Sequence, residues 1–576
     1  MKTVYLSMLL FLTISFGKAQ EFNYLSPTTG EVETYSSIEE YNSKYQPKFS
    51  TEGISKNTIE TLSSCTLTAP IESQAEINAL SSCTSIDGSI IIRGSFITDG
   101  SSTITDLSPL NNITSIGGIL EISGLPALTE FPSFTNLTQI GINLSLVDLP
   151  GLTTLPSFPN LSSIGGILTL RQLPFTSLVE FPNLTSVQSM TIVSNPQITS
   201  IDGFNALTSV ENTISIQSNA NLEEINGFNS LTSAGTIIYA FNNNTTELNG
   251  FDNITTIDRL AIAIISQSFD VTAFSKLETL GFLQLQNLQQ DNIDFLSSVT
   301  ELKYGMNITG SPLLTSLNGL DNAVLQEGIV IPASDTQINK SINISNCPAL
   351  SSLGSMDLTS TGHFPSISIV NTPNLTNASA LSGVGGEINV VNISNTDVLN
   401  LGFLSNISKI TSNLNISFNS SLTDISGISS LDLSELESLQ IANNNLLDEC
   451  NIASVCEVVG LAADPTNNPD LSVFINDNNT NCANISIVES ACGICAPGSK
   501  FITNQAEVDN FTCTVVDGDL YIEPSTPQGI TNLDGLSVLT EVTGSLYIIG
   551  TNITSMDGLE NLTSIGVDIA IGDNPL

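Results

Sequence analysis

The feature that most constrains this sequence is a repeat of about 23 residues. Each repeat contains Leu-Thr-Ser-Ile, a Gly or turn, Ile-x-Ile, a loop with Asn, Leu-x-x-Ile and Asp/Asn-Gly-Phe/Leu. Successive repeats begin at Ile113, Leu137, Leu161, Leu184, Leu207, Leu231, Ile254 and Leu277. A period of about 20–50 residues indicates a solenoid, because one coil cannot bury its own apolar face and must stack on its neighbours. The sequence therefore predicts a mainly β fold, a right-handed parallel β-solenoid with disulfide-bonded caps.

The repeat from Leu207 to Ser230 shows how one coil should be built. The alternation Ile214-Ser215-Ile216 predicts a strand with one buried face and one outward face. Stacked coils bring equivalent strands side by side, roughly 4.8 Å apart, in a parallel sheet. The residues predicted to point inward are Leu207, Val210, Ile214, Ile216, Leu222, Ile225 and Phe228.

The residue between the two inward residues of each strand should point outward, and these residues are mostly small, uncharged and polar. The predicted outward face consists of Thr169, Thr191, Ser215, Tyr239, Asn307, Asn343, Ser368 and Asn415, with Glu121, Ser145, Gln284 and Gln440 at equivalent positions. Such a face presents hydrogen-bond donors and acceptors at regular spacing, which suits an extended polymer. The alternative is that Ser, Thr and Asn are simply tolerated on an exposed parallel sheet.

The cysteines predict caps at the ends of the solenoid. Cys65 and Cys83 lie 18 residues apart, as do Cys495 and Cys513, and a Gln-Ala-Glu tripeptide precedes the second cysteine of each pair. A solenoid needs covered ends, so each pair predicts an amino-terminal cap with one disulfide.

Four further cysteines predict a carboxy-terminal cap with two disulfides, whose connectivity the sequence leaves open. They are Cys450, Cys456, Cys482 and Cys492. The alternative is a zinc or redox site at Cys492-x-x-Cys495, which the lack of an accompanying His disfavours. Cys347 is left over and stands three residues after Ile344, where other coils have Asn, so it is interpreted as a buried structural thiol.

The amino terminus has the features of a secretory signal: Lys2, an apolar stretch from Val4 to Phe16 and a small-residue exit. This signal predicts that the protein is exported, and secreted or attached to the cell surface. No later stretch has the roughly 20 apolar residues that span a bilayer. The predicted segments are a signal peptide (1–20), a mobile leader (21–60), a first array (61–492) with caps at 61–92 and 450–492, and a second array (493–576).

The charge balance narrows the possible partners. The net charge is −43, with only 13 Lys and Arg residues, which disfavours nucleic acid and anionic membranes. Aspartates recur before Gly, as at Asp202, but Asn replaces them at Asn226 and Asn249, so turn geometry explains them better than calcium does. No metal or cofactor is expected.

Three repeats carry a resemblance to a known family: Leu207-Thr208-Ser209-Val210, Leu231-Thr232-Ser233-Ala234 and Leu562-Thr563-Ser564-Ile565-Gly566. They resemble leucine-rich-repeat solenoids, above all the receptor L-domain type of growth-factor receptor ectodomains and many secreted bacterial surface proteins. The resemblance covers roughly residues 60–576. It implies extracellular recognition or adhesion, with a glycan or protein ligand and no catalytic residues to transfer. Many bacterial members end in a sorting domain; this chain stops within a coil, so a truncated second array is expected.

The alternative function is a polysaccharide-active β-helix enzyme, a lyase or hydrolase. A lyase needs cations beside the carbanion, but the only arginines are the scattered Arg93, Arg171 and Arg259. A hydrolase needs two carboxylates about 5–9.5 Å apart, and the acids do not line up on adjacent strands. A Ser-His-Asp triad would depend on His363 alone. The sequence therefore favours a non-enzymatic binding protein.

Overall fold

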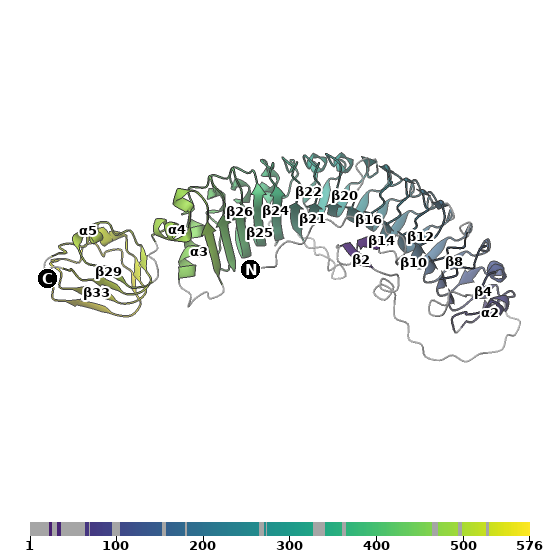
Figure 1. Cartoon of the computed structure of the whole chain (residues 1–576), viewed down its shortest axis with the longest axis horizontal. Coiled ribbons are helices and arrows are strands. Elements are labelled where there is room, and N and C mark those ends of the chain that lie inside the picture. Colours follow the sequence, from purple (N-terminus) through teal and green to yellow (C-terminus); the bar gives the residue numbers. More distant parts are fainter. Residues whose placement is uncertain are drawn as a thin grey trace, which may run out of the picture. The chain divides into compact units, whose positions relative to one another are not determined.

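The chain folds into stacked coils whose strands run parallel (Figure 1). A computed structural model describes residues 22–25, 32–35, 64–67, 69–94, 104–152, 157–178, 181–263, 270–271, 273–325, 340–359, 364–463, 471–493, 498–525 and 529–575. The predicted signal peptide, His363 and Cys495 lie outside the described residues. Two compact units are present: Met1–Leu231 with Ile237–Thr245, and Thr232–Thr236 with Thr246–Leu576.

In the first unit, each coil contributes one long strand or two short strands to the main sheet. These strands pair in parallel with the equivalent strands of the adjacent coils. These strands are β3 (Ser64–Cys65), β4 (Ser85–Ile86), β5 (Ile90–Arg93), β6 (Ser115–Ile116), β7 (Leu120–Ser123), β8 (Gln139–Ile140), β9 (Leu144–Val147), β10 (Ser163–Arg171), β12 (Ser186–Val193) and β14 (Ser209–Gln217). β16 (Ser233–Ala240) has residues in both units.

Short strands also pair outside this sheet. A second parallel sheet consists of β11 (Ser177–Leu178), β13 (Ser200–Ile201) and β15 (Glu224–Ile225). Within the predicted leader, β1 (Phe22–Leu25) and β2 (Val32–Tyr35) form an antiparallel pair.

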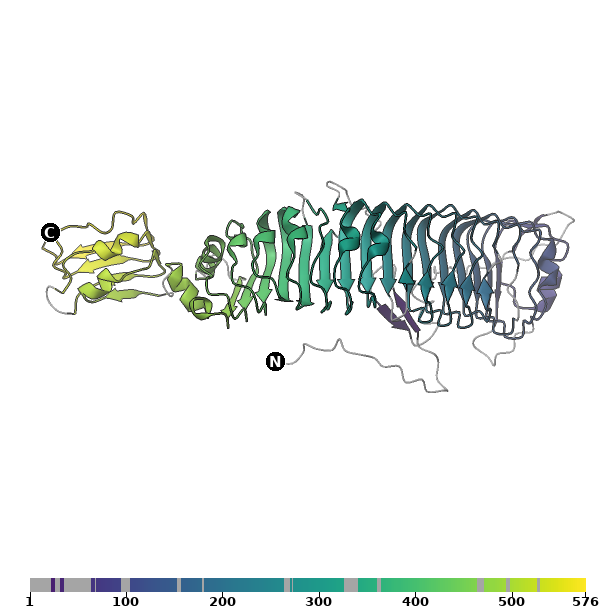
Figure 2. The same ribbon diagram turned by 90° about the horizontal axis from the view of Figure 1, so that it is seen from above.

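The second unit repeats the same plan (Figure 2). Its main strands are β18 (Thr256–Ala263), β20 (Thr279–Gln286), β21 (Glu301–Thr309), β22 (Val324–Leu325), β23 (Ser341–Ser345), β24 (Phe364–Thr372), β25 (Gly386–Thr396), β26 (Ile407–Ser417), β27 (Ser438–Ala442) and β28 (Ser472–Asn476). β17 (Glu247–Leu248) pairs separately with β19 (Asp270–Val271).

Residues 498–575, called here the C-terminal array, form two further small parallel sheets. One contains β29 (Lys500–Ile502), β31 (Leu520–Ile522), β33 (Leu546–Ile549) and β35 (Ile569–Gly572). The other contains β30 (Val515–Val516), β32 (Glu541–Val542) and β34 (Ser564–Ile565). The predicted fold class, a mainly β parallel solenoid of the leucine-rich-repeat kind, is therefore confirmed.

Helices are few and short. The α-helices are α2 (Gln74–Asn78), α3 (Ala453–Ala463), α4 (Ile485–Ala491) and α5 (Gln505–Asp509). Single 3₁₀ turns close several coils: η1 (Ser108–Asn112), η2 (Asp294–Leu296), η3 (Asn318–Leu320), η4 (Ser379–Gly383), η5 (Gly402–Leu404), η6 (Ser426–Ile428), η7 (Thr480–Cys482) and η8 (Asp534–Val538). In the described part of the chain, no helix has the length and apolarity needed to cross a membrane.

Identical inward positions stack their side chains from coil to coil. In the first unit, the fully buried rings of Phe134, Phe158, Phe181, Phe204 and Phe228 form a continuous stack. Neighbouring ring centroids lie 5.2–5.4 Å apart. This separation follows from the strand spacing, because each ring occupies the same place in its coil. In the second unit, Phe251 and Phe274 stack in the same way at 5.7 Å.

A second inward row consists of buried asparagines that hydrogen-bond the backbone of adjacent coils. The Asn219 side-chain oxygen accepts from the Asn195 backbone N–H at 3.0 Å, and its Nδ2 donates to the Ile192 carbonyl at 3.0 Å. Asn242 repeats the pattern one coil later, accepting from the Asn219 backbone N–H at 2.9 Å. In the second unit, Asn419 accepts in the same way from Thr396 at 3.0 Å. These bonds satisfy backbone groups that the strand ladder leaves unpaired.

Cys347 occupies the equivalent inward position and is fully buried with a free thiol. Its Sγ donates to the Ser345 carbonyl at 3.3 Å. Burial raises the pKa of the Cys347 thiol, and a hydrogen bond from the Ser311 backbone opposes that rise. The thiol thus stays neutral and takes part in the contact between coils, which fits a structural role.

The recurring Gln-Ala-Glu tripeptide has the same two functions in both amino-terminal caps. Gln74 clamps the next coil: its side chain donates to the Asp106 carbonyl at 2.7 Å and accepts from the Thr105 backbone N–H at 3.1 Å. Glu76 accepts from the Ser73 backbone N–H at 3.0 Å, which completes a capping box on α2. In the C-terminal array, Gln505 accepts from the Thr531 backbone N–H at 2.7 Å. Each cap therefore fixes its own helix and the following coil.

Disulfides hold the caps. Cys65 pairs with Cys83 beside α2, and Cys513 is also disulfide-bonded. In the carboxy-terminal cap the connectivity that the sequence left open is Cys450–Cys482 and Cys456–Cys492.

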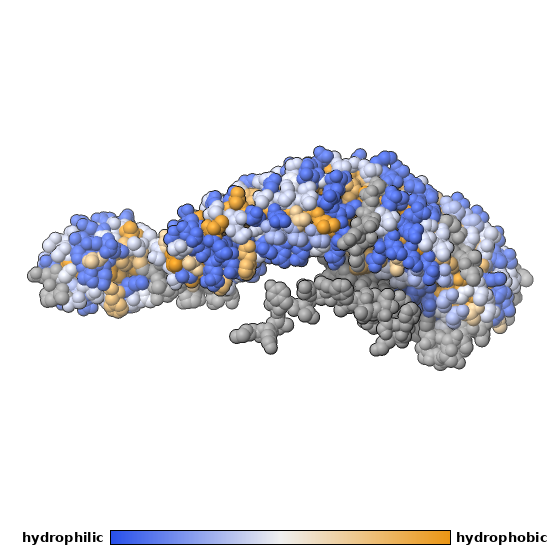
Figure 3. All heavy atoms as spheres, turned by 45° about the horizontal axis from the view of Figure 1, so that its top comes forward, coloured by the Kyte–Doolittle hydropathy of each residue, from blue (hydrophilic) through white to orange (hydrophobic). Residues whose placement is uncertain are grey.

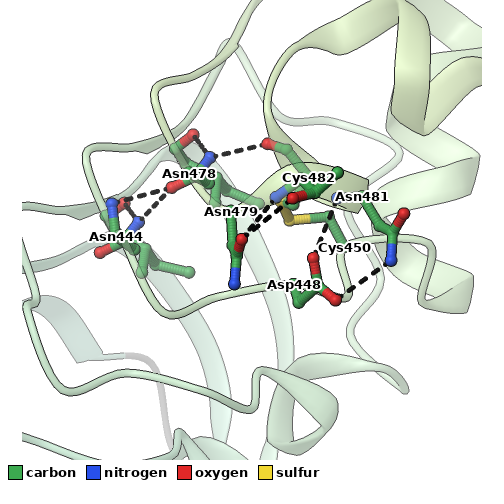
Figure 4. Close-up of a disulfide and its surroundings, with 10 residues drawn as sticks. Asn444, Asp448, Cys450, Asn478, Asn479, Asn481 and Cys482 are labelled. Atoms are coloured by element: carbon green, nitrogen blue, oxygen red, sulfur yellow. Dashed lines mark hydrogen bonds between the residues drawn. A yellow bond between two sulfur atoms is a disulfide. The ribbon is translucent and has the colours of Figure 1, made fainter.

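The asparagine row ends at the first of these two bonds (Figure 4). Asn478 accepts from the Asn444 backbone N–H at 2.9 Å and donates to the Cys482 carbonyl at 3.2 Å. Asp448 accepts from the Asn481 backbone N–H at 3.0 Å, in the same turn. The last coil is therefore hydrogen-bonded to a loop that the Cys450–Cys482 disulfide holds in place.

The asparagine row allows a test of what holds the coils together. Replacing Asn219 by Ala leaves the Asn195 N–H and the Ile192 carbonyl buried without partners, at about 1–3 kcal/mol each. We expect the free energy of unfolding to fall by about 2–6 kcal/mol, measured by urea denaturation followed by circular dichroism. The control is Asn221→Ala, at an exposed amide that donates to the Pro196 carbonyl and that water can replace. Equal losses in the two variants would contradict a stabilising role for the buried row.

Candidate ligand-binding face

The sheet of the second unit aligns one outward residue per strand in a single row. Asn343 of β23 pairs with Asn307 of β21 on one side and with Ser368 of β24 on the other. We call this the central row; in order it contains Ala261, Gln284, Asn307, Asn343, Ser368, Asn392, Asn415, Gln440 and Phe474. The parallel register therefore brings together Asn307, Asn343, Ser368 and Asn415 of the predicted face.

Polar groups in and beside the central row bond to one another across adjacent strands. The Asn415 Nδ2 donates to the Asn392 Oδ1 at 2.9 Å, and the Ser366 hydroxyl donates to the Asn343 Oδ1 at 3.2 Å. Within the described residues, no donor bonds the Asn415 Oδ1. That oxygen is buried, so a ligand does not reach it in this arrangement of the face.

Small polar residues also flank the central row. Residues two positions earlier in each strand include Ser341, Ser366, Asn413 and Ser438, and those two positions later include Thr309, Ser345, Ser394 and Ser417. Alternation in a strand places all of them on the same side of the sheet as the central row. We call the central row from Asn307 to Gln440, with these flanking residues, the polar face.

The first unit has its own outward row. Glu121, Ser145, Thr169, Thr191 and Ser215 follow one another in register. The predicted residues Thr169, Thr191 and Ser215 thus lie together here, and Thr169 and Thr191 are half-buried. Ser215 is buried and accepts from the Gln217 side chain at 2.8 Å.

An ion pair neutralises the one acidic residue of that row. The Arg93 guanidinium donates to both carboxylate oxygens of Glu121, at 2.6 and 2.8 Å. The hydrogen bond to Glu121 raises the pKa of Arg93, against the effect of burial. The paired charges leave this end of the row without an isolated charge.

Tyr239 does not belong to the outward face, and the prediction for it is corrected. The inward residues Ile192 and Ile216 lie three positions before Asn195 and Asn219, and Tyr239 lies three positions before Asn242 of the same row. The Tyr239 side chain is 2% exposed, and its hydroxyl donates to Thr245. Burial raises the pKa of Tyr239, so this hydroxyl stays neutral in the folded protein. Ile238 takes the outward position instead.

Sequence reasoning missed Asn392, which lies in the central row between Ser368 and Asn415. The pattern that would have found it is Val391-Asn392-Ile393, which repeats the Ile342-Asn343-Ile344 pattern of an earlier coil. Ala261 was missed for a different reason: it is apolar, and polar character was the criterion.

Metal-ligand side chains are not clustered in the described part of the chain. No three or more His, Cys, Asp or Glu side chains are grouped there so as to hold a metal ion. On the face of the molecule seen in Figure 3, hydrophilic and neutral residues cover most of the surface, and hydrophobic residues form small groups. The ordered rows of the sheets are thus the feature on which a binding role can be built.

Comparisons with known proteins identify one matching segment and several similar structures. Residues 512–574 match the receptor L domain family model. No curated protein matches the chain. Similar solved structures include an internalin (InlF) from Listeria monocytogenes, with 18% identity over 50% of this chain and 80% of that one and a TM-score of 0.18. A leucine-rich repeat protein from Bacteroides ovatus shares 14% identity over 69% of this chain and 95% of that one, with a TM-score of 0.15. A TLR13–ssRNA13 complex shares 13% identity over 87% of this chain and 86% of that one, with a TM-score of 0.18.

The inward position of Tyr239 has a measurable consequence. Truncating a buried aromatic residue costs about 3–5 kcal/mol, so Tyr239→Ala should lower the free energy of unfolding by about that amount. Thr191→Ala, on the outward row, should change it by less than about 0.5 kcal/mol. Urea denaturation of both variants beside the parent gives the comparison. If Tyr239→Ala left the free energy of unfolding unchanged, the inward position of Tyr239 would be wrong.

Proposed function

We propose that this protein is a non-enzymatic recognition protein whose polar face binds an extended, uncharged ligand, a glycan or an extended protein segment. The observation that carries the proposal is the in-register row of Asn, Ser and Gln side chains from Asn307 to Gln440. Equivalent groups recur at each strand, roughly every 4.8 Å. A polymer with a repeat of its own can meet such a row with many weak bonds at once.

The composition of the polar face supports an uncharged ligand and a binding role. The face contains Ser, Thr, Asn and Gln and no carboxylate among its named residues. Glycoside hydrolysis normally needs two carboxylates flanking the scissile bond, which this face does not supply. Repeated amide and hydroxyl groups both donate and accept, as sugar hydroxyls and peptide groups require.

Disulfides and the leucine-rich-repeat fold support a location outside the cell. Disulfides persist in oxidising compartments, and at least three hold the caps of this chain. The proposed role is therefore recognition or adhesion by a secreted or surface-attached protein. A repeat array suits that role because its stability comes from contacts between coils, which leaves the outward residues free to vary.

The test is binding of the full chain to a polysaccharide array, with released reducing sugar measured in the same samples. We expect saturable binding without sugar release. The double variant Asn343→Leu/Asn415→Leu keeps side-chain size but removes two amides, at about 0.5–1.5 kcal/mol per lost bond. Affinity should therefore fall about tenfold.

The matched control is Asn445→Leu, at an exposed position after β27 that lies outside the polar face. It should bind as the parent does. Equal affinity of the double variant and the parent would contradict the role of the polar face, and sugar release would contradict a non-enzymatic function. If no polysaccharide binds, the same three proteins are compared on an array of extended peptides.

A further inference from the structure

The C-terminal array carries a row of aromatic side chains that the polar face lacks. Phe501, Tyr521 and Tyr547 are the second residues of β29, β31 and β33 and are aligned in register. Their neighbours Ile502, Leu520, Ile522, Leu546 and Ile548 are buried, so the aromatic rings lie on the outward side. The ring centroids are 4.7 and 4.5 Å apart, and the ring planes are within 5° of parallel.

The stack leaves one face of the Phe501 ring open. Tyr521 covers one face, and among the described residues β29 is the first strand of its sheet and pairs with β31 alone. Phe501 is nevertheless 63% exposed. Stacking also fixes the ring plane, because Tyr521 is itself held between Phe501 and Tyr547. The open face is therefore presented in one orientation before any ligand arrives.

A cavity of about 460 Å³ lies beside this ring. Phe501 and Phe511 contribute its aromatic lining, and Lys500, Asn510 and Thr512 are among its polar lining residues. Within the described residues, the Lys500 ammonium and the Thr512 hydroxyl make no hydrogen bond or ion pair. The cavity thus combines an open aromatic face with unused polar groups, the usual composition of a small-ligand site.

Backbone groups add to this polar edge. The Lys500 N–H donates to the Asp519 carbonyl at 2.7 Å, and the Ile502 carbonyl accepts from the Glu523 N–H at 2.9 Å. Residues of a parallel strand alternate in the direction of their backbone bonds, so the N–H and C=O of Phe501 point away from β31. A hydroxyl-bearing ligand on the ring would have these two groups within its reach.

We propose that this cavity is a second ligand site, which binds one pyranose ring of a neutral glycan against the open face of Phe501. A pyranose ring has an apolar C–H face that matches an aromatic face, and its equatorial hydroxyls match the surrounding donors and acceptors. A nucleobase also stacks on an aromatic ring, but the phosphates of a nucleic acid would be repelled by a chain of net charge −43. An extended peptide added to the edge of β29 is the competing occupant, although β29 offers only three residues for pairing.

Because the chain contains no tryptophan, Phe501→Trp would place a single fluorescent reporter in the site. The probes are neutral hexasaccharides of glucose, mannose, xylose and N-acetylglucosamine, titrated into the full-length protein. We expect a saturable change in tryptophan emission with at least one of them. The control is Phe418→Trp, at a 55% exposed phenylalanine in the second unit, which should show no saturable change. No saturable change at position 501 with any hexasaccharide would overturn the proposal.

Truncation then tests the stacking itself. With the hexasaccharide that binds, Phe501→Ala should weaken the affinity at least tenfold by calorimetry, whereas Phe501→Tyr and Phe418→Ala should stay within about twofold. A loss as large in Phe418→Ala would overturn the site, and so would peptide binding that displaces the sugar. Tryptophan emission at position 501 reports this site alone, and the polysaccharide array with the Asn343→Leu/Asn415→Leu variant reports the polar face, so failure of this site and failure of the polar face are distinguishable.

Discussion

Hydrogen bonding between equivalent residues of adjacent coils is the constraint on which this structure depends. A single coil of about 23 residues has too little interior to bury its backbone turn or its apolar side chains. Asn219 shows the solution, because its side chain bonds the backbone of the preceding coil while its own backbone N–H bonds the Asn242 side chain. Neither coil is satisfied without the other, and stability therefore depends on the stack.

The same strict register that aligns the core also aligns the surface. Phe134 and Phe158 stack inside because they occupy one position in successive coils, and Asn307 and Asn343 align outside for the same reason. A solenoid therefore turns a preference at one repeat position into an ordered row. The character of such a row, amides in the second unit and aromatic rings in the C-terminal array, determines what kind of ligand can lie on it.

The sequence predicted the period, the strands and the inward residues because each follows from one recurring pattern. It failed at Tyr239 because Thr236-Ile237-Ile238-Tyr239 contains three consecutive apolar residues, which fit either phase of a strand. The inward asparagine resolves the phase, since Asn242 lies three residues after Tyr239 as Asn219 does after Ile216. Local sequence patterns do not contain the disulfide connectivity of the carboxy-terminal cap, which depends on how that cap folds against the last coil. They also do not contain the cavity beside Phe501, which depends on how the cap of the C-terminal array packs on its first coil.

The caps explain how the outward rows can differ so much within one chain. Gln74 and Gln505 both reach over to the next coil, and Glu76 and Glu507 both accept hydrogen bonds at the start of the cap helix. The glutamine bonds use backbone groups of the next coil, and the glutamate bonds use backbone groups of the cap itself. Because caps, asparagines and inward phenylalanines stabilise the contacts between coils, outward residues such as Asn343 and Phe501 are less constrained by those contacts. Outward positions can therefore change to suit a ligand at little cost in the free energy of unfolding.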